Sequence, residues 1–191
     1  MSEVANIVTG CQFSSSYTYY ACGFYALTEL KYMTRNDVKN TTSTNTIFME
    51  AMHTYRLYNG ANGPGDTSGM SNAQTLQMYK ALGLNYTPLG APGNVIARIR
   101  EAVKYGNIVQ VAISEPAIYD MALGRNPYTD WNPAGIHAIL ISGVDSNGNF
   151  IVRDSANCTG WVLRSQPRVY RASTMGIVNS YVVFPKWDKG C

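Results

Sequence analysis

The sequence HAILISGVDSNGNFIVRD, which runs from His137 to Asp154, contains two apolar stretches on either side of the turn sequence DSNG. The apolar stretches are rich in β-branched and aromatic residues, and Asp, Ser, Asn and Gly are the residues that tight turns favour. The segment therefore predicts a β-hairpin. It places His137 near the start of the first strand and Asp154 at the end of the second.

The register of this hairpin decides whether its two polar ends can meet. A loop over residues 145–148 pairs Val144 with Asn149, and it therefore brings Ile139 opposite Asp154. His137 is then a diagonal neighbour of Asp154 on the same face, with roughly 7–8 Å between the backbones. A shorter Asn-Gly turn would put Asp154 too far along the strand. The hairpin thus permits contact between an imidazole and a carboxylate.

Helical patterns come before strand patterns in the rest of the chain. Apolar residues recur at helical spacing after Gly23, and a capping box at Ser71–Gln74 begins another helix that Gly83 closes. Helices are expected over residues 23–33, 46–58, 71–83 and 94–106, and further strands over residues 108–113 and 180–184. The sequence predicts a single α+β domain over residues 1–191, in which N-terminal helices pack against a C-terminal antiparallel β-sheet. We expect two lobes with a cleft between them.

Composition narrows the class of protein. A hydrophobic fraction of 46% is ordinary for a folded domain. The net charge of +3 comes without a Lys/Arg run, so nothing indicates a nucleic-acid partner. No apolar stretch approaches the roughly 18–20 residues of a membrane span, and no secretory signal is visible. The low charged fraction of 14% and the 14 tyrosines are typical of secreted, virion or cell-envelope proteins, although the localisation stays unknown, as does the oligomeric state.

Cys22 lies where a helix is expected to begin. Backbone N–H groups and the dipole at a helix N-terminus favour a thiolate over a thiol, and the same N–H groups can bind an oxyanion. Cys22 is therefore a candidate nucleophile, and the alternative is a buried structural cysteine. The four cysteines show no metal-ligand spacing, and whether Cys11, Cys158 or Cys191 forms a disulfide stays open.

His137 and Asp154 supply the other parts of a thiol hydrolase. The chain has two histidines, and His53 lies inside a helical pattern, so His137 is the candidate base. Asp154 can orient its ring, and the side-chain amide of Gln12 can donate to an oxyanion beside Cys22. The alternatives are a structural histidine, an aspartate that caps a turn, and an orienting role for Asn157 or Asp130 in place of Asp154.

A long segment over residues 115–135 leads into His137. Long connections inside a compact domain usually have a function, and aromatic residues give a large contact area at low entropic cost. We expect Tyr128 and Trp131 to form a wall of the substrate cleft, with Gly23 contacting substrate beside the thiol. The alternative is that the aromatic residues of this segment pack over the sheet edge.

These residues, taken in their order, resemble the C39-like (bacteriocin-processing) cysteine peptidases of the papain-like clan. The most specific points are Gln12, the Cys22-Gly23 pair that opens a helix, His137 at a strand start and Asp154 at the end of the next strand. The likeness extends loosely over residues 12–184, because residues 74–83 resemble the helix of that family that ends in Leu-Gly, and residues 96–113 resemble its element of a helix, a glycine and a buried strand.

The resemblance implies a papain-like fold and a thiol peptidase acting on a peptide or protein substrate. It implies that Cys22 is the nucleophile, His137 the base, Asp154 the orienting acid and Gln12 the oxyanion donor, with no metal or organic cofactor. Two alternatives stay open at this point. One is a thiol acyltransferase of the transglutaminase-like kind, which shares the triad, and the other is a non-catalytic binding or virion structural protein with the same fold.

Overall fold

The contacts within the chain divide it into two compact units. One unit comprises Met1–Ala5, Tyr86–Asp154 and Pro167–Phe184, and the other comprises Asn6–Asn85, Ser155–Gln166 and Pro185–Cys191. The computed structural model describes residues 2–3, 22, 71–81, 84–89, 92–114, 118–127, 136–156, 158–159, 162–163 and 167–184.

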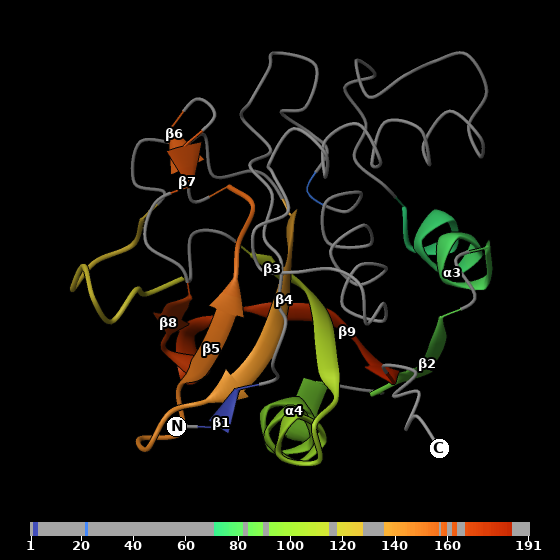
Figure 1. Ribbon diagram of the computed structural model, residues 1–191, viewed down its shortest axis with the longest axis horizontal. Helices are drawn as coiled ribbons and strands as arrows, with labels where there is room; N and C mark the ends of the chain where they lie inside the picture. Colours follow the sequence, from blue (N-terminus) through green and yellow to red (C-terminus); the bar gives the residue numbers. More distant parts are fainter. Residues whose placement is uncertain are drawn as a thin grey trace, which may run out of the picture. The chain divides into compact units, whose positions relative to one another are not determined.

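The first unit is built around a seven-stranded sheet (Figure 1). Its strands follow the order β2-β9-β3-β4-β5-β8, and β1 pairs with the end of β4. The pairs β9–β3, β3–β4, β4–β5 and β5–β8 are all antiparallel. The strands are β1 (Ser2–Glu3), β2 (Asn85–Pro88), β3 (Ile108–Ser114), β4 (Ile136–Val144), β5 (Phe150–Arg153), β8 (Arg168–Tyr170) and β9 (Ile177–Phe184).

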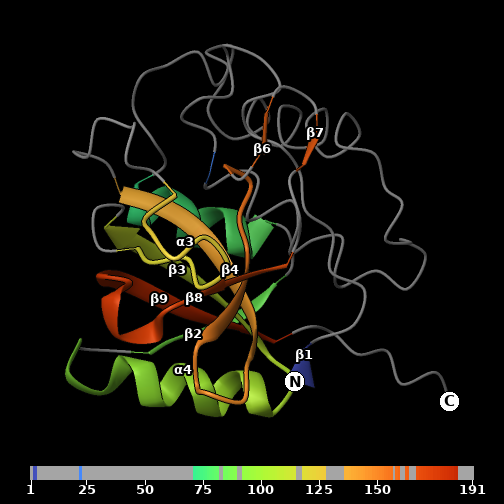
Figure 2. The ribbon, with the colours of Figure 1, turned by 90° about the vertical axis from the view of Figure 1, so that its left-hand side faces the viewer.

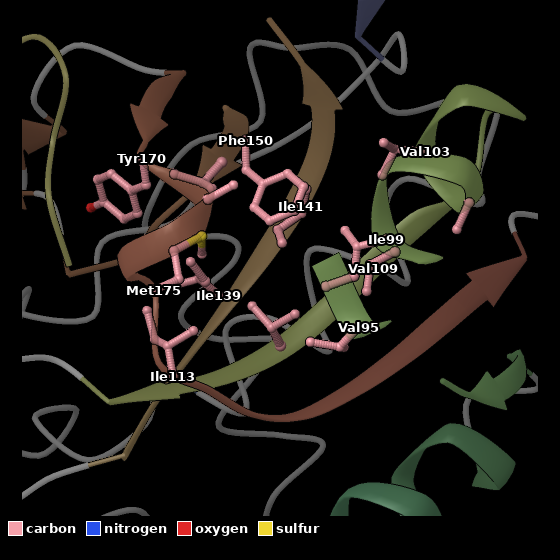
Figure 3. Packing of buried hydrophobic residues seen from close by; sticks show 14 of the residues in the cluster. Val95, Ile99, Val103, Val109, Ile113, Ile139, Ile141, Phe150, Tyr170 and Met175 are labelled. Atoms are coloured by element: carbon pink, nitrogen blue, oxygen red, sulfur yellow. The ribbon is translucent and has the colours of Figure 1, made fainter. Parts of the chain in front are cut away.

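Helix α4 (Val95–Lys104) packs against one face of this sheet and contacts β3, β4 and β9 (Figure 2). Its buried residues recur at helical spacing, so one face of the helix covers the sheet. Side chains from alternate positions of the central strands complete a continuous apolar cluster (Figure 3). The members drawn from α4 and the central strands are Val95, Ile99, Ala102, Val103, Val109, Val111, Ile113, Ile139, Ile141, Phe150 and Val152.

The ends of α4 follow from local sequence. The short 3-10 helix η3 (Pro92–Asn94) leads into it, and Gly106 follows its last turn with a positive φ of 81°. There the N–H of Gly106 bonds to the Val103 carbonyl and the N–H of Asn107 bonds to the Ala102 carbonyl, which together form a Schellman motif. Gly106 thus ends the helix as the sequence predicts, and β3 begins two residues later.

The second unit contains α3 (Asn72–Ala81) and a short pair of strands, β6 (Cys158–Thr159) and β7 (Val162–Leu163). The predicted capping box is present at the start of α3. The Ser71 N–H donates to Gln74 Oε1 at 2.8 Å, and the Gln74 N–H donates to Ser71 Oγ at 3.3 Å. The side chains of Met78 and Tyr79 in this helix are buried.

The structure confirms the α+β class and the strands expected over residues 108–113 and 137–154. The last strand begins earlier than expected, at Ile177, because a bulge opposite Ala112 and Ile113 lets its pairing with β3 continue. The sequence does not predict β2 and β8. Both are short, and β2 is a polar segment that ends in Pro88, as edge strands tolerate. The helices expected over residues 23–33 and 46–58 lie outside the described residues. Cys22, which directly precedes the first of them, is described and has a helical backbone.

The β4–β5 hairpin reaches the predicted geometry by a different route. Val144 pairs with Phe150 rather than with Asn149, so the loop spans residues 145–149. That extra residue alone would shift the register by one and turn Asp154 to the opposite face from His137. A β-bulge at Ser142 takes up one residue of β4, and beyond it Ile141 pairs with Val152. The two irregularities cancel, and the expected register returns.

We expect the loop glycine Gly148 to be sensitive to substitution. Its φ is 79°, and a Cβ there would lie 3.1 Å from the Arg100 guanidinium, which donates two hydrogen bonds to the Gly148 carbonyl. Gly148→Ala should lower the free energy of unfolding in urea by about 1–2 kcal/mol, the cost of a left-handed residue with a side chain.

Gly93→Ala is the matched control for this change. Gly93 has no positive φ, and no atom lies within 4 Å of a Cβ built there. That variant should be unchanged or more stable by up to about 1 kcal/mol. Equal losses for both variants would contradict the interpretation.

Candidate active site

The side chains of His137 and Asp154 contact each other on the buried face of the sheet. His137 is the second residue of β4 and stands opposite Ile113 of β3, and Asp154 directly follows β5. His137 Nε2 lies 2.8 Å from Asp154 Oδ1, and the two side chains are 1% and 0% exposed. The pair continues two rows of core side chains, since Ile139 and Val152 lie two residues away on the same face. The hairpin register therefore brings these two predicted site residues together.

A third side chain, from β8, completes this polar group. The hydroxyl of Tyr170 donates a hydrogen bond of 2.6 Å to Asp154 Oδ2. Tyr170 is fully buried, and its ring belongs to the apolar cluster beside its cross-strand neighbour Phe150. Tyr170 is not among the site residues that the sequence predicts. A buried tyrosine usually finds a partner for its hydroxyl, but its short strand is not predicted, so its neighbours could not be predicted either.

The arrangement assigns different tasks to the two nitrogens of His137. An ionised carboxylate can only accept hydrogen bonds, so beside ionised Asp154 the Nε2 atom carries the proton and donates. Nδ1 is then the ring nitrogen that can take a proton from another group. A buried carboxylate partner also stabilises the protonated form of an imidazole. The pair has the chemistry of a general base with its orienting acid.

A second buried pair supports the edge of the sheet next to β8. The carboxylate of Asp120, which is 0% exposed, accepts a 2.6 Å hydrogen bond from Arg168 Nε and also contacts Nη2 of the same guanidinium. Its other oxygen accepts the N–H groups of Ala122 and Leu123, at 2.8 and 3.1 Å. The sequence does not predict this pair, because no local pattern links residues so far apart in the chain.

Residues 118–125 run along β8 and extend the sheet edge. The Arg171 N–H bonds to the Tyr119 carbonyl, the Met121 N–H bonds to the Val169 carbonyl, and the Arg171 guanidinium stacks 3.9 Å from the centre of the Tyr119 ring. The sequence predicts that the aromatic residues of segment 115–135 either line a substrate cleft or pack over the sheet edge. Tyr119, which lies in this segment, packs at the sheet edge beside β8.

The remaining predicted site residues are only partly described. Cys22 has a helical backbone, is half-buried and forms no disulfide. It belongs to the second unit, whereas His137 and Asp154 belong to the first. Gln12, Gly23, Tyr128 and Trp131 lie outside the described residues, as do the alternative orienting residues Asp130 and Asn157.

Comparison with known proteins gives a structural likeness but no match in sequence. No protein-family model matches the chain, and no curated protein matches it. Among solved structures, the chain is similar to the crystal structure of a "putative C39-like peptidase from Bacillus anthracis", with a TM-score of 0.56 and 14% identity. The likeness covers 95% of this chain and 96% of that one. The two chains share a fold.

Within the described residues, no helix combines the length and the apolar character that crossing a membrane requires. The same part of the chain contains no group of three or more His, Cys, Asp or Glu residues that could hold a metal ion.

We expect the Asp120–Arg168 pair to contribute strongly to stability. Asp120→Asn keeps an acceptor for the two backbone N–H groups but leaves a charged guanidinium that is only 6% exposed without its counter-ion. The free energy of unfolding in urea should fall by about 3 kcal/mol, because a buried charge is costly without its partner.

Asp145→Asn is the matched control for the loss of charge. Asp145 also accepts two backbone N–H groups in a turn, those of Asn147 and Asn149, but its loop is more exposed and no arginine is bound to it in an ion pair of the described residues. Its substitution should change stability by less than about 1 kcal/mol. Similar small losses for both variants would show that the buried pair contributes little.

Proposed function

We propose that this protein is a papain-like thiol hydrolase that cleaves peptide or isopeptide bonds, with Cys22 as its nucleophile. The observation that carries the proposal is the buried 2.8 Å contact between His137 Nε2 and Asp154 Oδ1 at the start of a central strand. A histidine held in this way has a fixed orientation and a fixed tautomer, with Nδ1 as the nitrogen that can accept a proton. The fold shared with the Bacillus anthracis protein, named a "putative C39-like peptidase", supports the same class of chemistry.

In the proposed reaction, His137 Nδ1 takes the proton of the Cys22 thiol, and Sγ attacks the carbonyl carbon of the scissile bond. The C–N bond then breaks as the imidazolium returns the proton to the leaving amine. Water attacks the resulting thioester, again with His137 as base, and releases the acid and the free thiol. Asp154 holds the ring in the required tautomer throughout and stabilises the imidazolium.

The proposal places the remaining site residues around this reaction. Gln12 donates its side-chain amide to the oxyanion together with the Cys22 N–H. Gly23 lies next to the thiol, and Tyr128 and Trp131 form a wall of the cleft on the path into His137.

The state of the Cys22 thiol provides the first test. An ordinary thiol, with a pKa near 8.5, is less than about 1% ionised at pH 6, whereas a thiolate paired with an imidazolium reacts there. Iodoacetamide should therefore label Cys22 at pH 6 at least about tenfold faster in the native protein than in His137→Ala. Mass spectrometry of the Cys22 peptide separates its labelling from that of Cys11, Cys158 and Cys191.

The control for this labelling test is His53→Ala, which removes the other histidine of the chain. It should label at the native rate. Equal labelling rates in the native protein and in His137→Ala would contradict the proposed pairing and would favour a non-catalytic protein with this fold.

Turnover should separate the roles of Cys22, Gln12 and Asp154 by magnitude. With a library of quenched fluorescent peptides, Cys22→Ala should abolish cleavage at unchanged stability, and Gln12→Ala should lower kcat about 10²- to 10³-fold, the usual cost of an oxyanion donor. Asp154→Asn should leave residual activity, since other groups still hold the histidine.

Two outcomes of the turnover test would change the assignment. Mild and equal losses for all the variants would show that none of these residues is catalytic. Adding a primary amine such as glycinamide distinguishes hydrolysis from acyl transfer, because a thiol acyltransferase would form the amide product in preference to the acid.

A further inference from the structure

We propose that Tyr170 is a positioning residue for the reaction: its hydroxyl fixes the carboxylate of Asp154, and through it the ring of His137. This inference rests on the proposed function, because it assigns Tyr170 a role in the reaction that the proposed function supplies. It concerns a buried hydroxyl in β8, remote in sequence from both strands of the hairpin.

The geometry of the carboxylate is the first argument. Oδ1 of Asp154 faces His137 Nε2 at 2.8 Å, and Oδ2 accepts the Tyr170 hydroxyl at 2.6 Å. Each oxygen therefore has a different partner, supplied by a different strand. Rotation of the carboxylate about its Cβ–Cγ bond would break both contacts together. The Tyr170 hydroxyl thus keeps Oδ1 directed at the imidazole, and the short O–H···O distance is typical of a hydrogen bond to a charged acceptor.

Tyr170 is itself held firmly. Its ring lies in the apolar cluster near Phe150 and Met175, and in Figure 3 its hydroxyl oxygen points away from both of these side chains. Its strand pairs with β5 on one side and with residues 119–121 on the other. Two residues earlier, Arg168 anchors the same strand to Asp120. Because the ring and strand of Tyr170 are fixed by these contacts, its hydroxyl has a fixed position. The hydrogen bond from this hydroxyl therefore restricts the orientation of the Asp154 carboxylate.

The choice of side chain is the second argument. The ring position is an apolar one, where a phenylalanine would fill nearly the same volume without burying a hydroxyl. Burial of a polar group is unfavourable unless it is hydrogen-bonded. Here the hydroxyl bonds to the oxygen of Asp154 that the histidine does not use. This arrangement favours the ionised acid, whose oxygens can only accept hydrogen bonds, so that His137 donates to it from Nε2.

The test compares Tyr170→Phe with the native protein in two measurements. The rate of Cys22 labelling by iodoacetamide at pH 6 should fall about tenfold, and kcat for a cleaved peptide should fall by a similar factor with KM unchanged, the pattern for a group that acts in the transition state. Asp154→Asn should show a larger loss than Tyr170→Phe. A 4-fluorophenylalanine at position 170 fills the space of the hydroxyl without donating, so it should behave like phenylalanine and keeps the test valid if the smaller ring folds poorly.

Two control variants exclude a general effect of lowered stability. Ile141→Val weakens the same apolar cluster without removing a polar group, and Tyr105→Phe removes a hydroxyl from a residue that is 76% exposed. Both should label Cys22 and turn over peptide at the native rates. A loss in Ile141→Val equal to that in Tyr170→Phe would overturn the inference, because it would show that loosening the core is sufficient.

The outcome in His137→Ala separates the two proposals. If that variant labels slowly while Tyr170→Phe labels at the native rate, Tyr170 is only a packing residue and the proposed function stands. If His137→Ala also labels at the native rate, the proposed function fails and the positioning role fails with it.

Discussion

The contact between His137 and Asp154 places a strict demand on the whole sheet. Two ionisable side chains are buried at one end of an apolar core, where an unpaired member would be strongly destabilising. Their meeting depends on the pairing of β4 with β5, and the position of β4 depends in turn on its pairing with β3. Helix α4 covers the same face and fixes which side of these strands is the interior. The apolar packing and the polar contact thus require the same register.

Further buried polar residues support the pair of His137 and Asp154. Tyr170 contacts Asp154, and its strand is held at the outer edge by residues 118–125 and by the Arg168–Asp120 pair. The side chains of Tyr170, Asp154, Arg168 and Asp120 are all buried. Surroundings of this kind restrict the orientations open to the side chains of His137 and Asp154.

Much of this architecture is predictable from the sequence. The two apolar stretches on either side of the turn sequence DSNG identify the hairpin, helical spacing identifies α4, and Ser71 and Gln74 mark the start of α3. The sequence permits the contact of His137 with Asp154 but does not fix it, because the observed loop is one residue longer than expected and a bulge at Ser142 restores the register. Tyr170 and the Asp120–Arg168 pair do not follow, because they depend on β8, which is three residues long and becomes a strand only through pairing with β5. Short strands carry too little pattern to be recognised before their partners are known.

The bulge at Ser142 has a consequence for how related chains can be recognised. A hairpin with a shorter loop and no bulge would need the same number of residues between its histidine and its acid, since the bulge and the longer loop compensate each other. Two homologues could therefore align without a gap across this segment and still differ in backbone path. The quantity that must stay the same is the spacing of 17 positions from histidine to acid, and not the turn type. A single insertion or deletion inside the segment would consequently be more damaging than most substitutions there, because it would place the imidazole and the carboxylate on opposite faces of the sheet.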